Sequence, residues 1–197
     1  LLPTYLKTVL QFDIKQNGWL SAFPYLLMWI ISIASTQLLD LLITKKLLRT
    51  VLARKICQTI SQVGPALALV GAAYSGCDRT MTVALLTLAV GINGLVFGGY
   101  VVNHVDISPN HAGILMGISN TASNICGFIA PYAAGLLINE NPSLERWRIV
   151  FFISAAIYIS AVIFFDIFAS GTQQPWNDLQ DDSDSSEKKP TAKNKNK

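Results

Sequence analysis

Long runs without a charged residue are the feature that most constrains the fold of this chain. Four runs of at least 22 residues contain no Asp, Glu, Lys or Arg, and a fifth, at 149–165, has 17 residues. About 20 apolar residues cross the hydrocarbon core of a bilayer as one helix. We therefore predict an all-α membrane protein with five complete spanning helices, at 18–41, 55–75, 80–103, 111–138 and 147–169.

The amount and placement of charge argue against a soluble globule. Hydrophobic residues make up 51% of the chain and charged residues 14%, whereas a soluble domain carries about 25% charged residues. Ten of the charged residues, five acidic residues and five lysines, stand in the last 20 residues. A nucleic-acid-binding domain would show a basic face, so we expect no nucleic-acid partner.

Motifs for enzymatic chemistry are absent from the sequence. It contains no GxSxG, no HExxH and no phosphate-binding loop. Cys57, Cys77 and Cys126 are scattered without the spacing of metal ligands. We therefore expect no catalytic residues, no metal site and no organic cofactor.

The first ten residues form an apolar segment that is too short to cross a bilayer. Ten helical residues span about 15 Å, which is half the apolar thickness, and residue 1 is Leu. We expect the chain to begin inside a sixth helix and to belong to a longer protein. The alternative is a truncated membrane fragment that does not transport and at most binds a partner.

Basic residues indicate the orientation in the membrane. Between the first two complete helices, five bases stand within eleven residues, at Lys45, Lys46, Arg49, Arg54 and Lys55. The opposite side of the membrane also carries five basic residues, which are more widely spread along the sequence. The five C-terminal lysines lie on the same side as the first group. Because basic loops stay in the cytosol, we place this side there. Low hydrophobicity predicts a disordered cytosolic tail at 171–197 after a membrane domain at 1–170.

The predicted helix 111–138 carries one stripe of small and polar residues. Steps of four and three residues place them on one face, at Gly113, Gly117, Asn120, Asn124, Gly127, Pro131 and Ala134. One interpretation is close helix packing through glycines. The other is that the two carboxamides project into a polar cavity, where they donate hydrogen bonds to anionic oxygens, while Pro131 allows the helix to bend.

The preceding predicted helix has a second close-packing signal and a titratable group. Gly94 and Gly98 are four residues apart. His104 is either a functional titratable group or an interfacial histidine bonded to backbone. Because no acidic or basic residue lies at mid-membrane, we expect coupling carboxylates and anion-binding arginines to lie outside this chain.

Two motif runs carry a family resemblance. Asn-His-Val-Asp-Ile-Ser-Pro stands at 103–109, and Ala-Gly-Ile-Leu-Met-Gly-Ile-Ser-Asn at 112–120. The chain resembles solute carrier family 17 of the major facilitator superfamily: sialin, the vesicular glutamate transporters and the sodium-phosphate cotransporters. It is most similar to insect members described as inorganic phosphate cotransporters. Further matching segments are 2–5, 20–26, 168–171 and 174–176.

The resemblance implies the C-terminal six-helix half of a twelve-helix transporter, with helix seven partial and helices eight to twelve complete. The missing N-terminal half and the lipid bilayer would be its partners. The whole protein would carry inorganic phosphate or a small organic anion with sodium or protons by alternating access. We expect the plasma membrane rather than a lysosomal or vesicular membrane.

The resemblance also implies roles for particular residues. By motif position, the family's anion path falls on Tyr5, His104, Asn120 and Asn124. The family's inner gate falls on acidic and basic residues at the cytosolic helix ends, namely Asp40, Lys45, Lys46, Arg54, Lys55 and Asp106. His111 stands where the family has a tyrosine, a departure that could alter this gate.

Overall fold

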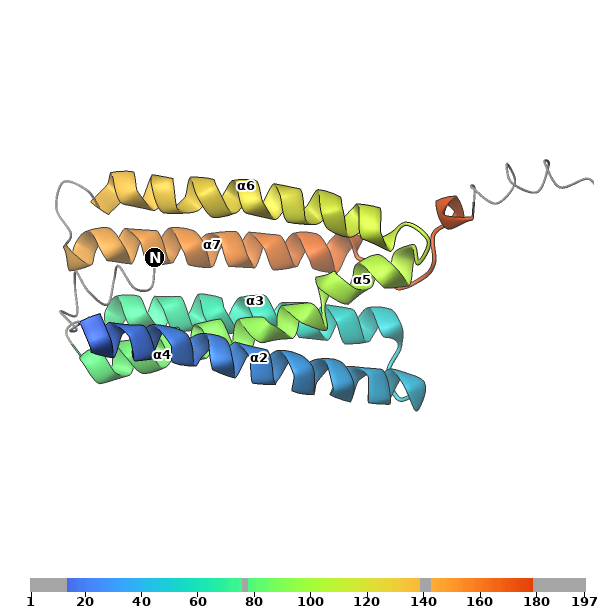
Figure 1. Ribbon diagram of the computed structural model, residues 1–197, viewed down its shortest axis with the longest axis horizontal. Helices are drawn as coiled ribbons and strands as arrows, with labels where there is room; N and C mark the ends of the chain where they lie inside the picture. The colour runs from blue at the N-terminus through green and yellow to red at the C-terminus, as the bar shows by residue number, and fades with distance from the viewer. Residues whose placement is uncertain (1–13, 76–77, 139–142, 179–197) are drawn as a thin grey trace, which may run out of the picture.

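The computed structural model describes residues 14–75, 78–138 and 143–178, and this part of the chain contains helices and no strands. The α-helices are α2 (Ile14–Thr44), α3 (Thr50–Tyr74), α4 (Arg79–Asn93), α5 (Tyr100–Ile107), α6 (Ala112–Ile138) and α7 (Leu144–Phe168). Two short 3₁₀ helices are η1 (Gly94–Phe97) and η2 (Pro175–Asn177). Figure 1 shows the long helices running roughly parallel or antiparallel along one axis.

Five segments of the described chain are long and apolar enough to span a membrane. They are Ser21–Thr44, Thr50–Tyr74, Arg79–Ile107, Ala112–Ile138 and Leu144–Phe168. The prediction of five complete spanning helices is therefore confirmed, and the protein is an integral, multi-pass membrane protein. The bounds of α6 differ from the predicted ones by one residue, whereas α3 begins five residues before the predicted position 55.

The span predicted at 80–103 is present, but it is not one continuous α-helix. The chain leaves the α-helix after Asn93, passes through η1 and starts α5 at Tyr100. Glycine weakens a helix interior because it loses the most backbone entropy on folding, and Gly98 and Gly99 stand in the break. Gly99, which precedes α5, has φ −89° and ψ −114°, outside the helical region. This break frees backbone groups that the site described below uses.

Helix α3 forms the centre of the packed part of the molecule, between α7 and α4 (Figure 1). Its alanines are buried where they meet Trp147, Val150 and Phe151 of α7 and Leu86 of α4. In a membrane, small residues allow helix backbones to approach closely and so gain dispersion contacts. Ala72 and Ala73 supply that small surface here, and Trp147 fills the space beside them with 1% of its surface exposed.

Helix α2 packs against α4 and η1 through glycines. A Cβ on Gly94 would overlap the backbone carbonyl of Met28, and one on Gly98 would lie 2.8 Å from Leu39 Cδ1. The absence of a side chain at both positions therefore permits the contact. The predicted close-packing pair thus lies at an interface between helices in this structure.

Helix α6 lies along the edge of the bundle beside α7 (Figure 1). Within α6 only Ala134 is buried, and Ile118 and Phe128 are 64% and 81% exposed. Most of its circumference is thus uncovered by the described part of the chain. Apolar side chains are suited to lipid on part of this surface, and the polar stripe occupies another part.

The segment after α7 differs from the expected disordered tail. Residues 171–178 run along the outside of the loop between α5 and α6 and include η2 (Figure 1). Asn177 has only 2% of its surface exposed. The expectation of disorder from residue 171 onward is therefore wrong for this stretch, because specific hydrogen bonds anchor it. The remainder of the predicted tail, 179–197, lies outside the described residues.

Candidate functional site

An ion pair joins α3 to α5 near the ends of both helices. Arg54 Nε lies 2.7 Å from Asp106 Oδ2, and Nη2 lies 3.4 Å from Oδ1. Nη1 also donates to the carbonyl of Gly98 at 3.2 Å. That carbonyl precedes α5 and stands outside its hydrogen-bond ladder, so the helix break supplies an acceptor to the arginine. We refer to this end of the bundle as the Arg54 end.

The Arg54–Asp106 pair is well shielded from solvent. The side chain of Arg54 is 4% exposed and that of Asp106 is 17% exposed. Burial of a single charge without its partner is far more costly than burial of a bonded pair. The two residues therefore stabilise the contact of α3 with α5 only as long as both are present.

The six residues predicted for the inner gate do not form one cluster. Among the described residues, Arg54 and Asp106 form the one ion pair. Lys55 Nζ instead donates to the backbone carbonyl of Asp166 on α7, at 2.6 Å. Asp40, Lys45 and Lys46 are exposed, and Lys46 adopts a positive φ of 57° in the turn after α2. Their gating role stays a prediction.

His104 connects α5 to α6. Its Nδ1 lies 3.0 Å from the carbonyl of Val101, and its Nε2 lies 2.7 Å from Ser119 Oγ. The Ser119 hydroxyl also donates to the Leu115 carbonyl at 2.9 Å. A carbonyl only accepts, so both the ring Nδ1 and the hydroxyl must donate there. With Nδ1 as the donor to Val101, the tautomer decides whether Nε2 donates to the Ser119 hydroxyl or accepts from it.

Sequence reasoning did not identify Ser119. The α5–α6 connection is a tight hairpin, so residues at similar distances before and after its turn lie opposite each other. His104 is seven residues before His111, and Ser119 is eight residues after it. Counting outward from the turn would have paired them.

Asn120 and Asn124 lie on α6 with their side chains exposed. The glycines of the same stripe have open space around them: a Cβ at Gly113, Gly117 or Gly127 would meet no atom within 4 Å. Helix α6 continues through Pro131 to Ile138. No described element covers the stripe from Gly113 to Gly127, whereas Ala134 at its far end is buried in the cluster with α3 and α7. The choice between a packing face and a cavity face therefore stays a prediction. Tyr5, the fourth predicted path residue, lies outside the described residues.

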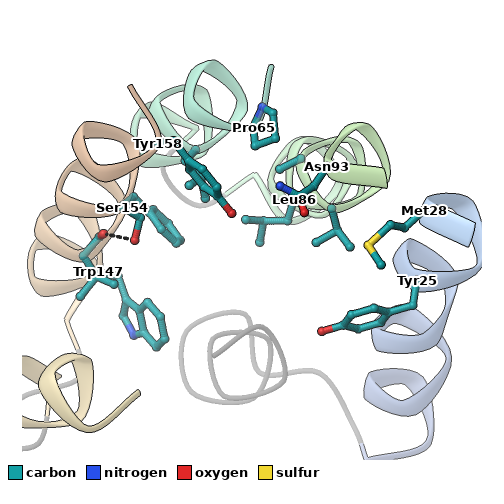
Figure 2. A pocket seen from close by; sticks show the side chains of 13 residues that line it. Tyr25, Met28, Pro65, Leu86, Asn93, Trp147, Ser154 and Tyr158 are labelled. Carbon is teal, nitrogen blue, oxygen red and sulfur yellow. Dashed lines mark hydrogen bonds between the residues drawn. The ribbon is translucent and has the colours of Figure 1, made fainter. Parts of the chain in front are cut away.

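A cavity of about 300 Å³ opens between α2, α3, α4 and α7. Figure 2 shows Tyr25, Asn93 and Tyr158 around it, with Trp147 and Ser154 on the α7 side. Asn93 Nδ2 also donates to the carbonyl of Ser61 at 3.4 Å. The described residues that line this cavity include none with a charge. It offers hydroxyl and amide groups on an apolar wall, which is insufficient by itself to hold an anion.

A wider cavity, of about 610 Å³, includes His104 among its lining residues, together with side chains of α3 and α7. Gln58 Oε1 accepts a hydrogen bond there from the backbone nitrogen of Tyr100, at 3.3 Å. This amide of Tyr100 begins α5, so the glutamine caps a helix start that the break has exposed. The buried Asn103 Oδ1 has no hydrogen-bond partner among the described residues.

Comparison with known proteins identifies the family. The family model described as Major Facilitator Superfamily matches residues 1–195. The chain therefore belongs to this superfamily of membrane transporters, which are not enzymes.

Three relatives illustrate the similarity. A Drosophila ananassae protein named "Putative inorganic phosphate cotransporter" is 46% identical over 92% of this chain and 38% of its own length. Sialin of Homo sapiens is 43% identical over 89% of this chain and 35% of its own. Vesicular glutamate transporter 2 of Homo sapiens is 40% identical, with 92% and 31% covered.

These relatives confirm the resemblance to solute carrier family 17 that the motifs at 103–109 and 112–120 indicated. Their names include sialin, a vesicular glutamate transporter and a phosphate cotransporter. The chain spans about a third of their length. The described part corresponds to a partial transporter of this superfamily, as expected.

Proposed function

We propose that the full-length protein is a secondary active transporter of inorganic phosphate or a small organic anion, coupled to sodium or protons. The arrangement on α6 is the observation that carries this proposal. Asn120 and Asn124 are exposed on the part of the stripe, from Gly113 to Gly127, that no described element covers. Ser119, next to them, is bonded to His104. Amide and imidazole N–H groups are hydrogen-bond donors suited to anionic oxygens.

The ion pair at the Arg54 end supports alternating access. In such a cycle, a substrate site near the midplane is exposed to one side and then to the other as packed units rock. A buried pair of charges has two favourable states, paired in a dry contact or separately hydrated, and few states between them. Arg54 and Asp106 are placed to act in this way between α3 and α5. In this proposal, the Arg54 end faces the cytosol and the protein resides in the plasma membrane.

Uptake by the full-length protein in proteoliposomes tests the proposal. Radiolabelled phosphate, glutamate and sialic acid are offered separately under a sodium gradient, a proton gradient and a membrane potential. Sodium-driven phosphate uptake is the expected result. Uptake of an organic anion under proton or voltage drive assigns the other substrate class. Silence for all three substrates contradicts the proposed anion specificity and leaves the substrate unknown. The alternative of a truncated, non-transporting fragment is tested by the upstream reading frame, where six further helices would restore the transporter.

The variants Asn120→Leu and Asn124→Leu test the path on α6. Each removes an amide donor, so we expect the KM for the transported anion to rise about tenfold, as for a lost hydrogen bond to a charged group. Thr121→Val is the matched control, because the Thr121 hydroxyl donates to the carbonyl of Gly117 in its own helix. If both leucine variants retain wild-type KM and rate, the path does not run along this stripe.

A further inference from the structure

The segment 169–178, which we call the C-terminal clasp, reaches from the end of α7 to the loop between α5 and α6 (Figure 1). It contains η2 and ends at Asp178. No motif in the sequence assigns a role to it.

Asn177 is the main anchor of the clasp. Its Oδ1 accepts hydrogen bonds from Ser108 Oγ at 2.8 Å and from the backbone nitrogen of Asn110 at 3.0 Å. Its backbone carbonyl accepts from Asn110 Nδ2 at 3.2 Å, and its Nδ2 donates to Asp178 Oδ1 at 2.7 Å. Both lone pairs of Asn177 Oδ1 accept a hydrogen bond, and the residue is 2% exposed. Removal of this side chain would break both of these bonds to the loop and leave the buried Ser108 hydroxyl with His111 Nδ1 as its remaining partner.

Two further contacts attach the clasp to the helices that carry the ion pair. The backbone nitrogen of Gln174 donates to the carbonyl of Ile107, the last residue of α5, at 2.8 Å. Gly171 lies directly against the start of α3, where a Cβ would come within 2.6 Å of Val51 N. The clasp therefore contacts both α5 and α3 within about one turn of Asp106 and Arg54.

We propose that Asn177 is a positioning residue for the Arg54–Asp106 pair, and that the clasp holds the end of α5 in register with α3. Ile107 and Ser108, which the clasp binds, follow Asp106 directly in the chain. A shift of this turn would move the carboxylate relative to Arg54. The consequence for transport rests on the function proposed above, whereas the effect on the pair does not.

Cys57 provides a native reporter of this contact. It lies on α3 about one turn beyond Arg54 and is 4% exposed. A Cβ on Gly98, the residue whose carbonyl Arg54 binds, would lie 3.5 Å from Cys57 Sγ. Separation of α5 from α3 at the pair would admit water and reagent to this thiol.

The test measures the rate at which a membrane-permeant maleimide alkylates Cys57 in the full-length protein, with every other cysteine replaced by serine. We expect Asn177→Ala to raise the rate about tenfold, as the loss of buried hydrogen bonds would allow. Gln173→Ala is the matched control on the same segment. Gln173 is exposed and bonds to Asp178 but, in the described structure, not to the α5–α6 loop.

A paired exchange separates positioning from general damage. In Asn177→Asp combined with Asp178→Asn, the new carboxylate still accepts from Ser108 and Asn110, and the new amide donates to it. We expect this double variant to restore slow alkylation, whereas Asn177→Asp alone places two carboxylates together and stays fast. If Asn177→Ala does not fold, Ser108→Ala removes the bond from Ser108 Oγ to Asn177 Oδ1, together with the contact of this hydroxyl with His111 Nδ1. It leaves the bonds of Asn110 in place and should raise the rate by a smaller factor.

Two results would overturn the proposal. One is an alkylation rate in Asn177→Ala equal to that in Gln173→Ala. The other is fast alkylation that the paired exchange fails to reverse. Uptake is measured on the same variants, and we expect a lower maximal rate with unchanged KM for Asn177→Ala. If the wild type transports none of the anions while the alkylation pattern holds, the proposed function fails and the clasp stands.

Discussion

The same spacing of two glycines has opposite outcomes in two parts of this molecule. Gly94 and Gly98 lie where α4 and η1 meet α2, and a Cβ at either would collide with a neighbour. Gly113 and Gly117 on α6 have the same spacing, yet nothing described lies within 4 Å of a Cβ there. The motif therefore indicates that two backbones can approach, whereas the position of each helix in the bundle decides whether they do.

The difference extends to the polar groups on each side. In the packed region, Arg54, Gln58 and Ser61 are buried and their hydrogen bonds go to other parts of the chain or to their own helix. On α6, Asn120 and Asn124 are exposed. Polar groups satisfied in a packed interface contribute to stability, while exposed ones remain available for a ligand or a partner helix. The following predictions test this division.

The largest expected effect is on the packed side. Asp106→Ala leaves the guanidinium of Arg54 buried without its counter-charge, so we expect a loss of about 3–5 kcal/mol in stability. Thermal denaturation of the purified full-length protein in detergent, followed by size-exclusion chromatography, measures it. The double variant Arg54→Met with Asp106→Ala should recover much of the loss. A single variant as stable as the wild type would show that the pair is solvated.

A smaller effect separates the two glycine pairs directly. Gly94→Ala introduces a methyl group against the backbone of Met28, and overpacking of this kind costs about 1–3 kcal/mol. Gly113→Ala fills open space in the described structure, and we expect no loss of stability. The same thermal assay compares the two. Equal destabilisation would mean that a part of the full-length protein outside the described residues covers the stripe, and this would favour the packing interpretation of α6.

The smallest effect concerns the bridge between α5 and the uncovered helix α6. Ser119→Ala removes one hydrogen bond from His104, which corresponds to about 1 kcal/mol. The imidazole is the one titratable group of this bridge, so a part for the bridge in the transport cycle would be visible in the pH profile of uptake. Uptake measured across the range in which histidines change charge should depend less on pH in Ser119→Ala and in His104→Ala. Profiles identical to that of the wild type would make the bridge purely structural.

The spanning helices were the most predictable part of the fold. Lengths of uncharged sequence located all five, because the cost of burying charge in lipid acts on each segment separately. The interruption after Asn93 was not predicted. The hydropathy of the segment is the same whether it forms one α-helix or two α-helices joined by a 3₁₀ turn. Four glycines at 91, 94, 98 and 99 were the available signal.

The candidate site was predictable only in its composition. His104, Asn120 and Asn124 were named from motifs, and their roles remain predictions. Ser119 was missed because its relevance depends on the hairpin that brings it to His104. Asn177 was missed because the composition of the tail indicated disorder. The burial of Asn177 depends on hydrogen-bond donors of Ser108 and Asn110, which stand 69 and 67 residues earlier in the chain.

By itself, the sequence determined that this protein is an α-helical membrane protein and which superfamily of transporters contains it. Segment length, hydropathy and motif order can be read from the sequence directly. They determine which segments insert into the membrane and to which family the protein belongs. The tertiary structure alone decided which glycines are covered, that Arg54 meets Asp106, and that the residues after α7 return to the α5–α6 loop. These outcomes depend on contacts between segments that are distant in the sequence. Such contacts form, and contribute to stability, only when the helices pack against one another.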